Sequence, residues 1–434
     1  RMVPCLLDDS TRQSHDKKRT RKLKQDCDIA VIGAGPAGST VAKLLHDAGL
    51  HVTVLEAQEF PRFVIGESLL PNCMNVLERA GFVPALEEAG FQHKNGAVFE
   101  CGPKYRTIDF RQNFETTGWG TTYQVKRAEF DHILANETAS AGVDLRFGHK
   151  VTAVRASDGN CLITYQDKAG VTGELQAGFI VDASGYGRVL PKLLGLSRAP
   201  QSISRRAVFT HVKDRIDDPG YDRDKILITV HPDRHDIWYW LIPFSDGTAS
   251  VGVIYPDGDP EFSGMNEQDV FHRLISETRL GQMLANAEPT RQLQSIAGYS
   301  AESENLCGDG YVLLGNAAGF LDPVFSSGVT IALHSAELAA DMLIARHQGR
   351  TDIDWDTGFA KPLAHGVETF RSYVNAWYDG RLQTIIFEQP DDDFQLKRMV
   401  VSILAGYAWN MENPLVAKTD RYLEMLHDLC APAS

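Results

Sequence analysis

The spacing of apolar residues predicts a strand, a helix and a second strand near the start of the chain. Residues 28–32 form an apolar run of strand length, residues 37–48 are rich in helix formers, and residues 51–55 form a second apolar run. Two later apolar runs, at 179–182 and 311–314, each lead into a glycine-bearing segment. This alternation of strands and helices predicts an α/β fold with a parallel sheet.

A second block of the chain predicts an antiparallel sheet. Candidate strands lie at 207–212, 225–232, 236–244 and 248–256. The tripeptide Ser-Asp-Gly between the last two favours a hairpin turn. The remaining chain, 346–434, is mostly helix-forming and rich in aromatic residues, so we expect a helical C-terminal region.

The strand "HDIWYWLIPF" contains two of the six tryptophans. Successive strand residues point to opposite faces, so Trp238, Trp240 and Ile242 share one face while Tyr239 and Leu241 share the other. Two indoles on one face suit either a packed core or the wall of a binding site. The alternation alone leaves both interpretations open.

Composition narrows the classes of function. The chain has 434 residues, 43% of them hydrophobic and 23% charged, as in soluble globular proteins of more than one domain. The net charge of −14 argues against general nucleic-acid binding. We find no apolar stretch of about 18 residues and therefore expect no integral membrane contact.

The seven cysteines include no C-x-x-C pair, which argues against a disulfide framework or a metal site and favours a reducing, cytoplasmic setting. Residues 1–26 are basic and lack the apolar core of a secretory signal, so we expect a mobile leader.

The strongest chemical signal is the glycine pattern between the first strand and helix. Gly33, Gly35 and Gly38 form G-x-G-x-x-G, and Glu56 ends the second strand. The glycines permit a tight turn, close approach of a pyrophosphate and close helix–strand packing. The helix N-terminus favours phosphate, and the carboxylate can accept hydrogen bonds from ribose hydroxyls. A dinucleotide site is expected.

Two later segments indicate which dinucleotide. "FIVDASGYGR" ends a strand at Asp182, and "LLGNAAGFLDPVFSSGV" ends another at Gly315-Asn316. Together with "YQVKRAEFDHIL" they resemble the aromatic-hydroxylase-like flavoproteins, which implies FAD. That family usually has Gly-Asp where this chain has Gly315-Asn316, and an asparagine can still bond a ribityl hydroxyl. The cofactor residues implied are Gly33, Gly35, Ala37, Gly38, Glu56, Arg62, Gln124, Arg127, Asp182, Gly315, Asn316, Asp322, Gly328 and Val329.

The expected fold class is therefore α/β, with a Rossmann-type FAD-binding domain, an antiparallel β-sheet substrate domain and a mostly helical C-terminal region. After the leader, we expect the FAD-binding domain at 27–200, with a short excursion into the substrate domain near 106–119. The substrate sheet is expected at 201–290, the closing part of the FAD-binding domain at 291–345, and helices that cover the substrate site at 346–434.

Three motifs resemble the flavin-dependent halogenases over roughly residues 27–345. G-E-S-x-x-P spans 66–71, W-x-W-x-I-P begins at Trp238, and Lys94 lies just before a strand. The best match in motif and length is the subgroup that acts on phenols or on carrier-tethered pyrroles. In that family two indoles separate the flavin from the substrate, which assigns Trp238 and Trp240 to this wall.

The resemblance implies a two-site mechanism. FAD, reduced by a separate flavin reductase, reacts with O2 and chloride or bromide to give hypohalous acid. The acid moves to Lys94, which either hydrogen-bonds it or becomes a haloamine, and an electron-rich ring is then halogenated. Desolvation lowers the pKa of a buried lysine, which suits this role, whereas most lysines are solvated surface groups.

The loop "DPVFSSGV" departs from the tryptophan halogenases, which carry a glutamate where this chain has Phe325. Free tryptophan is therefore not expected as substrate, and a pyrrole or phenol is. Ser326, Ser327 and Gly328 match the segment that holds halide. Backbone N–H groups beside apolar side chains suit a small anion, although a serine here could equally cap the following helix.

Two alternatives to a halogenase remain open. One is a related reductase or monooxygenase of the geranylgeranyl-reductase or aromatic-hydroxylase type, because G-E-S-x-x-P is shared with that branch. The other is a non-enzymatic relative of the fold that binds a protein or lipid. The expected partners of the halogenase are a flavin reductase and an acyl or peptidyl carrier protein, and the expected assembly is a monomer or homodimer.

Overall fold

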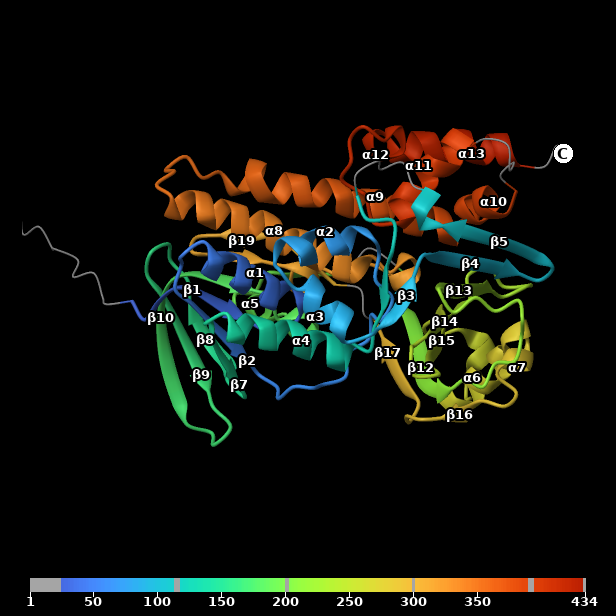
Figure 1. Ribbon diagram of the computed structural model, residues 1–434, viewed down its shortest axis with the longest axis horizontal. Helices are drawn as coiled ribbons and strands as arrows, with labels where there is room; N and C mark the ends of the chain where they lie inside the picture. Colours follow the sequence, from blue (N-terminus) through green and yellow to red (C-terminus); the bar gives the residue numbers. More distant parts are fainter. Residues whose placement is uncertain (1–24, 113–117, 200–202, 299–300, 389–393, 432–434) are drawn as a thin grey trace, which may run out of the picture.

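The computed structural model describes residues 25–112, 118–199, 203–298, 301–388 and 394–431. It consists of two sheet-based layers side by side and a helical layer above them (Figure 1). The expected leader lies almost entirely outside the described residues. Its last residue, Asp26, is bound to the first sheet through a backbone N–H that donates to the Gln176 carbonyl at 2.8 Å.

The first sheet is the nucleotide-binding sheet, and its central strands are parallel. They run in the order β20 (Tyr311–Leu313), β10 (Thr172–Asp182), β1 (Cys27–Ile32), β2 (Val52–Glu56) and β7 (Asp144–Phe147). The antiparallel strands β8 (Lys150–Arg155), β9 (Cys161–Gln166) and β19 (Cys307–Gly308) extend it. The three apolar runs at 28–32, 179–182 and 311–314 thus lie next to one another in the parallel sheet that the sequence predicts.

Helices cover this sheet and bury its apolar strands. The helix predicted at 37–48 is α1 (Pro36–Asp47), which packs on α4 (Arg127–Ser140) and α8 (Ser327–His347). Among the described residues, α8 is the one helix long and apolar enough to cross a membrane by length and composition. In the structure it packs against α1, α2 (Asn72–Arg79) and α9 (Lys361–Tyr378), and about half of its residues are buried.

The second sheet carries the predicted tryptophan strand. Its order is β16 (Glu288–Pro289), β12 (Arg205–Lys213), β15 (Thr248–Pro256), β14 (Trp238–Pro243), β13 (Lys225–Val230), β4 (Gly96–Cys101) and β5 (Lys104–Asp109), and β17 (Gln294–Ala297) also pairs with β12. The predicted hairpin is present as the antiparallel pair β14–β15. Tyr239 and Leu241 face the core beneath α6 (Glu267–Ser276) and α7 (Arg279–Met283), whereas Trp238, Trp240 and Ile242 belong to the main core.

Two of the predicted domain boundaries need correction. The chain joins the second sheet at Gly96, not at 106, because β4 pairs in parallel with β13 and forms a hairpin with β5. Residues 113–117 of the predicted excursion lie outside the described residues. The return to the first sheet follows Ala297 instead of 291, because β17 pairs with β12. The sequence of a short strand shows the alternation of its residues, but it does not show which sheet the strand joins.

The C-terminal region is helical, as predicted. After α9 it contains α10 (Arg381–Glu388), α11 (Phe394–Leu404), α12 (Pro414–Ala417) and α13 (Thr419–Cys430). These helices lie above the second sheet, over the β4–β5 hairpin (Figure 1). Short elements complete the connections: α3 (Val83–Glu88), α5 (Val189–Leu193), the pair β3 (Gln92–Lys94) and β6 (Thr122–Gln124), and the pair β11 (Ser197–Arg198) and β18 (Glu302–Ser303).

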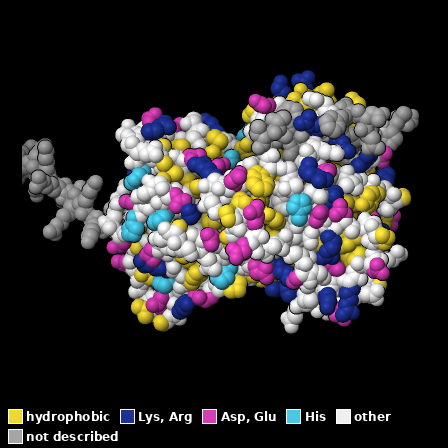
Figure 2. Space-filling model, viewed as in Figure 1, with side chains coloured by type: hydrophobic (Ala, Val, Ile, Leu, Met, Phe, Trp, Pro, Cys, Tyr) yellow, Lys and Arg dark blue, Asp and Glu magenta, His cyan; other side chains and the backbone are white. Residues whose placement is uncertain are grey.

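The surface is mixed in charge. On the face shown in Figure 2, acidic and basic side chains are interspersed across the molecule without forming one field of a single sign. This distribution agrees with the moderate negative net charge of the sequence, which is −14.

Candidate active site

A cavity of about 690 Å³ has walls from both sheets. One end is lined by the glycine turn after β1, the end of β2 and the loop after β10. The other end is lined by apolar side chains of the second sheet: Ala207, Phe209, Ile226, Trp238, Trp240, Ile242 and Ile296. The cavity therefore connects the predicted nucleotide site to the tryptophan strand.

The three glycines of the turn serve different purposes. A Cβ at Gly38 would lie 1.9 Å from the Gly33 carbonyl oxygen, and a Cβ at Gly33 would lie 2.7 Å from the Ala183 oxygen, so the fold itself needs both. A Cβ at Gly35 would meet only the Arg62 guanidinium, at 3.5 Å, which is ordinary contact. Gly35 lines the cavity. The protein does not require this glycine, whereas a phosphate held against the backbone would.

The acid at the end of β2 lies where the motif predicts. Glu56 is buried and lines the cavity. Its Oε2 accepts the Ala34 N–H at 2.8 Å and its Oε1 accepts the Gln58 N–H at 2.9 Å. A carboxylate has lone pairs for further donors, so Glu56 can still accept from ribose hydroxyls. The glycine turn and Glu56 together fit the adenosine and pyrophosphate of FAD.

Two arginines line the cavity beside this site. Asp131 accepts hydrogen bonds from Arg62 Nη1 at 2.9 Å and from Arg127 Nε at 2.7 Å. Arg127 also donates to the Ile65 and Gly66 carbonyls, at 3.2 and 3.3 Å. The Asp131 carboxylate raises the pKa of Arg127 against the opposing effect of burial. Both guanidinium groups are thus held as fixed cations at the cavity wall.

Most predicted cofactor residues line the cavity, and a few lie behind its wall. Those in the wall are Gly33, Gly35, Ala37, Glu56, Arg62, Arg127, Gly315, Asn316, Gly328 and Val329. Asp182 accepts the backbone N–H groups of Ser184 and Leu190, at 2.9 and 2.7 Å, and so shapes the loop behind the wall. Gln124 donates to the Arg223 carbonyl at 3.1 Å, away from the cavity lining.

The predicted halide segment is the start of α8. Ser326 has φ 57°, a left-handed conformation that a residue other than glycine rarely adopts, and its side chain does not cap the helix. Ser326 and Gly328 line the cavity, whereas Ser327 is buried outside its lining. The first N–H groups of α8 are therefore uncapped by this serine, and a helix N-terminus favours an anion.

Lys94 is fully buried at the end of β3. Its Nζ donates to Ser68 Oγ and to the Leu69 carbonyl, each at 2.7 Å, and lies 5.2 Å from the Phe110 ring centre. Burial lowers the pKa of Lys94 to about 7. Ser68 lines the cavity, so one side chain separates Lys94 from it. A neutral amine with both N–H groups bonded would keep a free lone pair.

The two indoles are held by specific contacts. Trp240 Nε1 donates to Ser250 Oγ at 3.0 Å, and its ring lies across its β15 partner Gly252, where a Cβ would be 2.3 Å from the indole. Trp238 Nε1 donates to Tyr378 Oη at 2.8 Å. The ring centres of Trp238 and Trp240 are 6.0 Å apart. Both indoles line the cavity and belong to the main core, so packing in the core does not exclude a role in the cavity wall.

Tyr378, at the end of α9, joins the tryptophan strand to the loop before α8. Its hydroxyl accepts from Trp238 and donates to Asp322 Oδ2 at 2.8 Å. The Arg205 guanidinium lies over its ring, 3.3 Å from the centre. Burial, and after it the Asp322 carboxylate, raises the pKa of Tyr378, so the hydroxyl keeps its proton.

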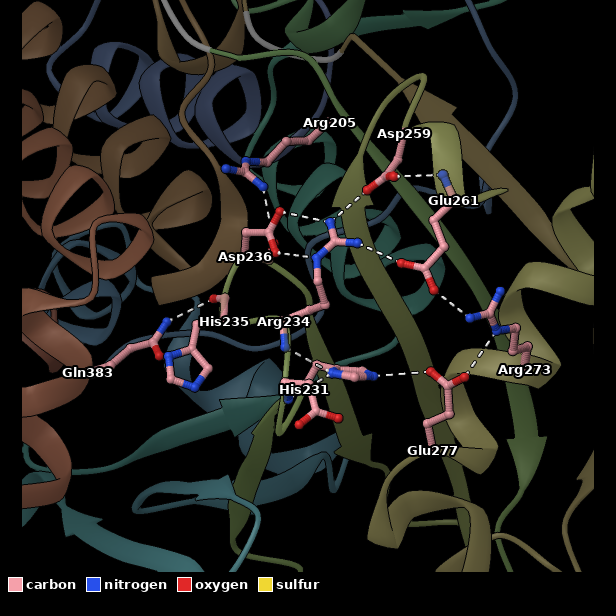
Figure 3. Close-up of polar contacts among 11 residues, drawn as sticks. Arg205, His231, Arg234, His235, Asp236, Asp259, Glu261, Arg273, Glu277 and Gln383 are labelled. Carbon is pink, nitrogen blue, oxygen red and sulfur yellow. Dashed lines mark hydrogen bonds and ion pairs between the residues drawn. The ribbon is translucent and has the colours of Figure 1, made fainter. Parts of the chain in front are cut away.

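The turn that precedes β14 is tied to the C-terminal helices (Figure 3). Gln383 of α10 donates to the His235 carbonyl at 3.0 Å, and Arg205 donates to the Asp236 carbonyl at 3.1 Å. Arg234 bridges Asp236 and Asp259. The position of Trp238 therefore depends on helices far along the chain.

Phe325 lies behind the cavity and faces the C-terminal helices. Its ring meets those of Tyr373 and Trp377 edge-on, with centres 6.2 and 5.7 Å away. Tyr373 Oη and Trp377 Nε1 are buried without a hydrogen-bond partner among the described residues. The aromatic cluster thus includes two polar atoms that the fold itself leaves unpaired.

Several residues of this site could not be found from the sequence. The sequence shows Glu67 only as part of G-E-S-x-x-P. In the structure its Oε1 lies 2.7 Å from Nε2 of His211 in β12. Tyr378 and Gly252 carried no local signal, because their partners lie far away in sequence. Among the described residues, no group of three or more His, Cys, Asp or Glu side chains could hold a metal ion.

Comparisons with known proteins agree with this geometry. The family model of the FAD binding domain matches residues 26–354. A 1H-pyrrole-2-carbonyl-[peptidyl-carrier protein] chlorinase from Pseudomonas fluorescens is 30% identical, with 88% of this chain and 89% of the relative covered. A tryptophan 2-halogenase from Chondromyces crocatus is 31% identical, with 80% and 66% covered.

Solved structures have the same architecture. A flavoprotein/dehydrogenase from Cytophaga hutchinsonii is 39% identical, covers 93% of this chain and 98% of its own, and superposes with a TM-score of 0.88. A triple mutant of the flavin-dependent brominase Bmp2 is 25% identical, with 93% and 98% covered and a TM-score of 0.77.

The fold and the family match define an FAD-binding oxidoreductase. Within that class, the chain belongs to the flavin-dependent halogenases, as the resemblance of its motifs predicted. FAD is its cofactor, and halide and O2 are cosubstrates. When bound and reduced, FAD supplies the electrons that activate O2. Three features fit this cofactor: the space beside Gly35, the carboxylate of Glu56, and the start of α8, which the Ser326 side chain does not cap.

Proposed function

We propose that this protein halogenates an electron-rich ring, a pyrrole or a phenol, through hypohalous acid that passes to Lys94. The observation that carries the proposal is the placement of this lysine. It is fully buried, its pKa is lowered to about 7, and its partner Ser68 forms part of the flavin cavity wall. A surface lysine would have none of these properties.

The chain's own residues have distinct tasks in this proposal. The Trp238 and Trp240 indoles line the cavity on the side of the second sheet and keep an organic substrate away from it. Ser326 and Gly328, with the start of α8, offer N–H groups to the halide. Ser68 and the Leu69 carbonyl hold Lys94 Nζ beside the cavity. The amine then holds the electrophilic halogen for the ring.

The substrate class rests on the aromatic cluster around Phe325. This apolar ring occupies the place where tryptophan halogenases carry a glutamate, so a ring that loses its proton easily is favoured. The name of the pseudomonad relative supports a pyrrole tethered to a peptidyl carrier protein. The Chondromyces relative, named a tryptophan halogenase, makes free tryptophan the critical comparison. A separate flavin reductase would supply the reduced FAD.

The test is mass spectrometry of candidate substrates with FAD, a flavin reductase, O2 and each halide in turn. Free and carrier-tethered pyrroles and phenols are compared with free tryptophan. We expect halogenated pyrrole or phenol and unmodified tryptophan. Efficient turnover of tryptophan would contradict the assignment of Phe325.

A second candidate is a flavin oxidoreductase that uses no halide. It is favoured by the similarity to the Cytophaga flavoprotein/dehydrogenase, which is 39% identical. A product that forms equally well without chloride and bromide would support this second candidate.

A further inference from the structure

A buried carboxylate–imidazole pair lies at the sheet end of the cavity and has no role in the proposed function so far. Glu67, from G-E-S-x-x-P, lines the cavity, and its Oε1 is 2.7 Å from His211 Nε2. His211 belongs to no sequence motif and comes from β12 of the second sheet. Phe209, two residues earlier on the same face of that strand, is 6.1 Å from Trp240, ring centre to ring centre.

The pair lies between the cavity lining, to which Glu67 belongs, and a histidine side chain that is partly exposed. The Glu67 side chain is 0% exposed, and the His211 side chain is 11% exposed. Glu67 Oε2 is buried without a hydrogen-bond partner among the described residues. A buried carboxylate oxygen normally has a partner, so an unpaired one in a cavity wall indicates a group that is brought by the ligand or by the reaction.

The surroundings of the pair hold it in place. The rings of Phe63 and Phe244 lie edge-on to the imidazole, with centres 5.6 and 5.3 Å away. The charged groups nearest to it from the neighbouring elements are Arg127, whose pKa Glu67 helps to raise, Arg291 over the Phe63 ring at 3.7 Å, and Lys126 over the Phe244 ring at 5.5 Å.

Halogenation consumes a proton. One reduced flavin, one O2, one halide ion, one proton and one aromatic C–H give oxidised flavin, one carbon–halogen bond and two waters. Two of the four hydrogens in the waters come from the reduced flavin, one comes from the ring, and the fourth must enter from solvent. An acid built into the cavity wall can deliver that proton at one defined place.

We propose that Glu67 and His211 form a proton relay that supplies this proton at the sheet end of the cavity. The imidazole takes up a proton at Nδ1 and passes the one on Nε2 to Glu67 Oε1. The carboxyl group then donates to the acceptor in the cavity and returns to its ionised form, and the imidazole returns to its Nε2–H tautomer by proton exchange with solvent before the next turnover. Only bonds to hydrogen form and break.

The experiment compares Glu67→Gln, which keeps size and a hydrogen bond but cannot carry the proton, with Glu277→Gln. Glu277 accepts from His231 at 3.0 Å in a similar pair on the α6 side of the sheet, away from the cavity lining (Figure 3). For each protein we would measure FAD affinity, halogenated product and peroxide per reduced flavin consumed. A His211→Ala variant is assayed with and without added imidazole.

The relay predicts FAD affinity within about twofold of wild type in Glu67→Gln, a product rate at least ~10-fold lower, and more peroxide. It also predicts partial recovery of His211→Ala by imidazole and no change in Glu277→Gln. A product rate within about threefold of wild type in Glu67→Gln would overturn the relay, as would a loss explained fully by weaker FAD binding. The inference rests on the proposed halogenation, and absence of product from wild type and Glu277→Gln alike would refute that function instead.

Discussion

At the scale of single residues, the glycine turn separates what the fold needs from what the cofactor needs. Gly38 and Gly33 are required by backbone contacts, whereas Gly35 has room for a Cβ. We predict that Gly35→Val folds with a thermal midpoint near that of wild type and binds no FAD, because its side chain would occupy the place of the pyrophosphate. Gly38→Ala is the contrast, since it should lower the midpoint. Flavin retained by folded Gly35→Val would refute the cofactor site.

Lys94 gives a prediction with a direction in pH. Its pKa is about 7, and its amine is neutral above that value. Two N–H groups already donate to Ser68 and Leu69, so the neutral amine is the form with a free lone pair. Halogenated product per reduced flavin should therefore rise as pH rises through about 7 and then level off. A fall over that range would instead favour the ammonium as hydrogen-bond donor to hypohalous acid.

Trp240 tests whether the indole wall matters beyond stability. Trp240→Phe loses the hydrogen bond to Ser250 and covers less of Gly252, so it should cost about 1 kcal/mol of unfolding free energy. FAD binding should persist, and the ratio of peroxide to product should rise. Ser250→Ala is the control, because it removes the same bond and leaves the ring. Phe substitutions at both tryptophans with an unchanged ratio would leave the strand as ordinary core.

At the scale of elements, α9 links the tryptophan strand to the loop before α8. Tyr378→Phe removes the bonds to Trp238 and Asp322 and keeps the ring beneath Arg205. Since each such bond contributes about 1 kcal/mol, we expect the halide KM to rise roughly threefold to tenfold with little change in FAD affinity. Tyr373→Phe, which removes a buried hydroxyl without a partner among the described residues, should leave the halide KM unchanged. Equal halide KM values in the two variants would argue against the link.

The same scale shows how far sequence reasoning reaches. The hairpin β14–β15 and the faces of Trp238 and Tyr239 were predictable, because strand alternation and turn residues are local signals. The membership of β4 and β17 in the second sheet could not be predicted, because tertiary contacts determine which strands pair. For the same reason the sequence assigns Glu67 no role beyond its place in G-E-S-x-x-P, and nothing in it points to the partner His211.

At the scale of the molecule, one cavity connects three regions that are distant in sequence. The glycine turn comes from the first sheet, the indole wall from the second, and Ser326 from the loop before α8. Tyr378 of the helical region lies behind this wall and accepts a hydrogen bond from Trp238. The lysine lies behind a wall that contains Ser68. The central claim of the proposed two-site account is that this arrangement separates the place where the oxidant forms from the amine that receives it.

The most direct test of that claim is one measurement on wild type and Lys94→Ala side by side. Reduced FAD, O2 and bromide or chloride are supplied with a carrier-tethered pyrrole, and mass spectrometry records halogenated product per flavin oxidised. We predict halogenated product from wild type, with the isotope pattern of the halide supplied. Lys94→Ala should oxidise reduced flavin at a similar rate and give at least ~100-fold less product. Product from Lys94→Ala within a few-fold of wild type would contradict the account.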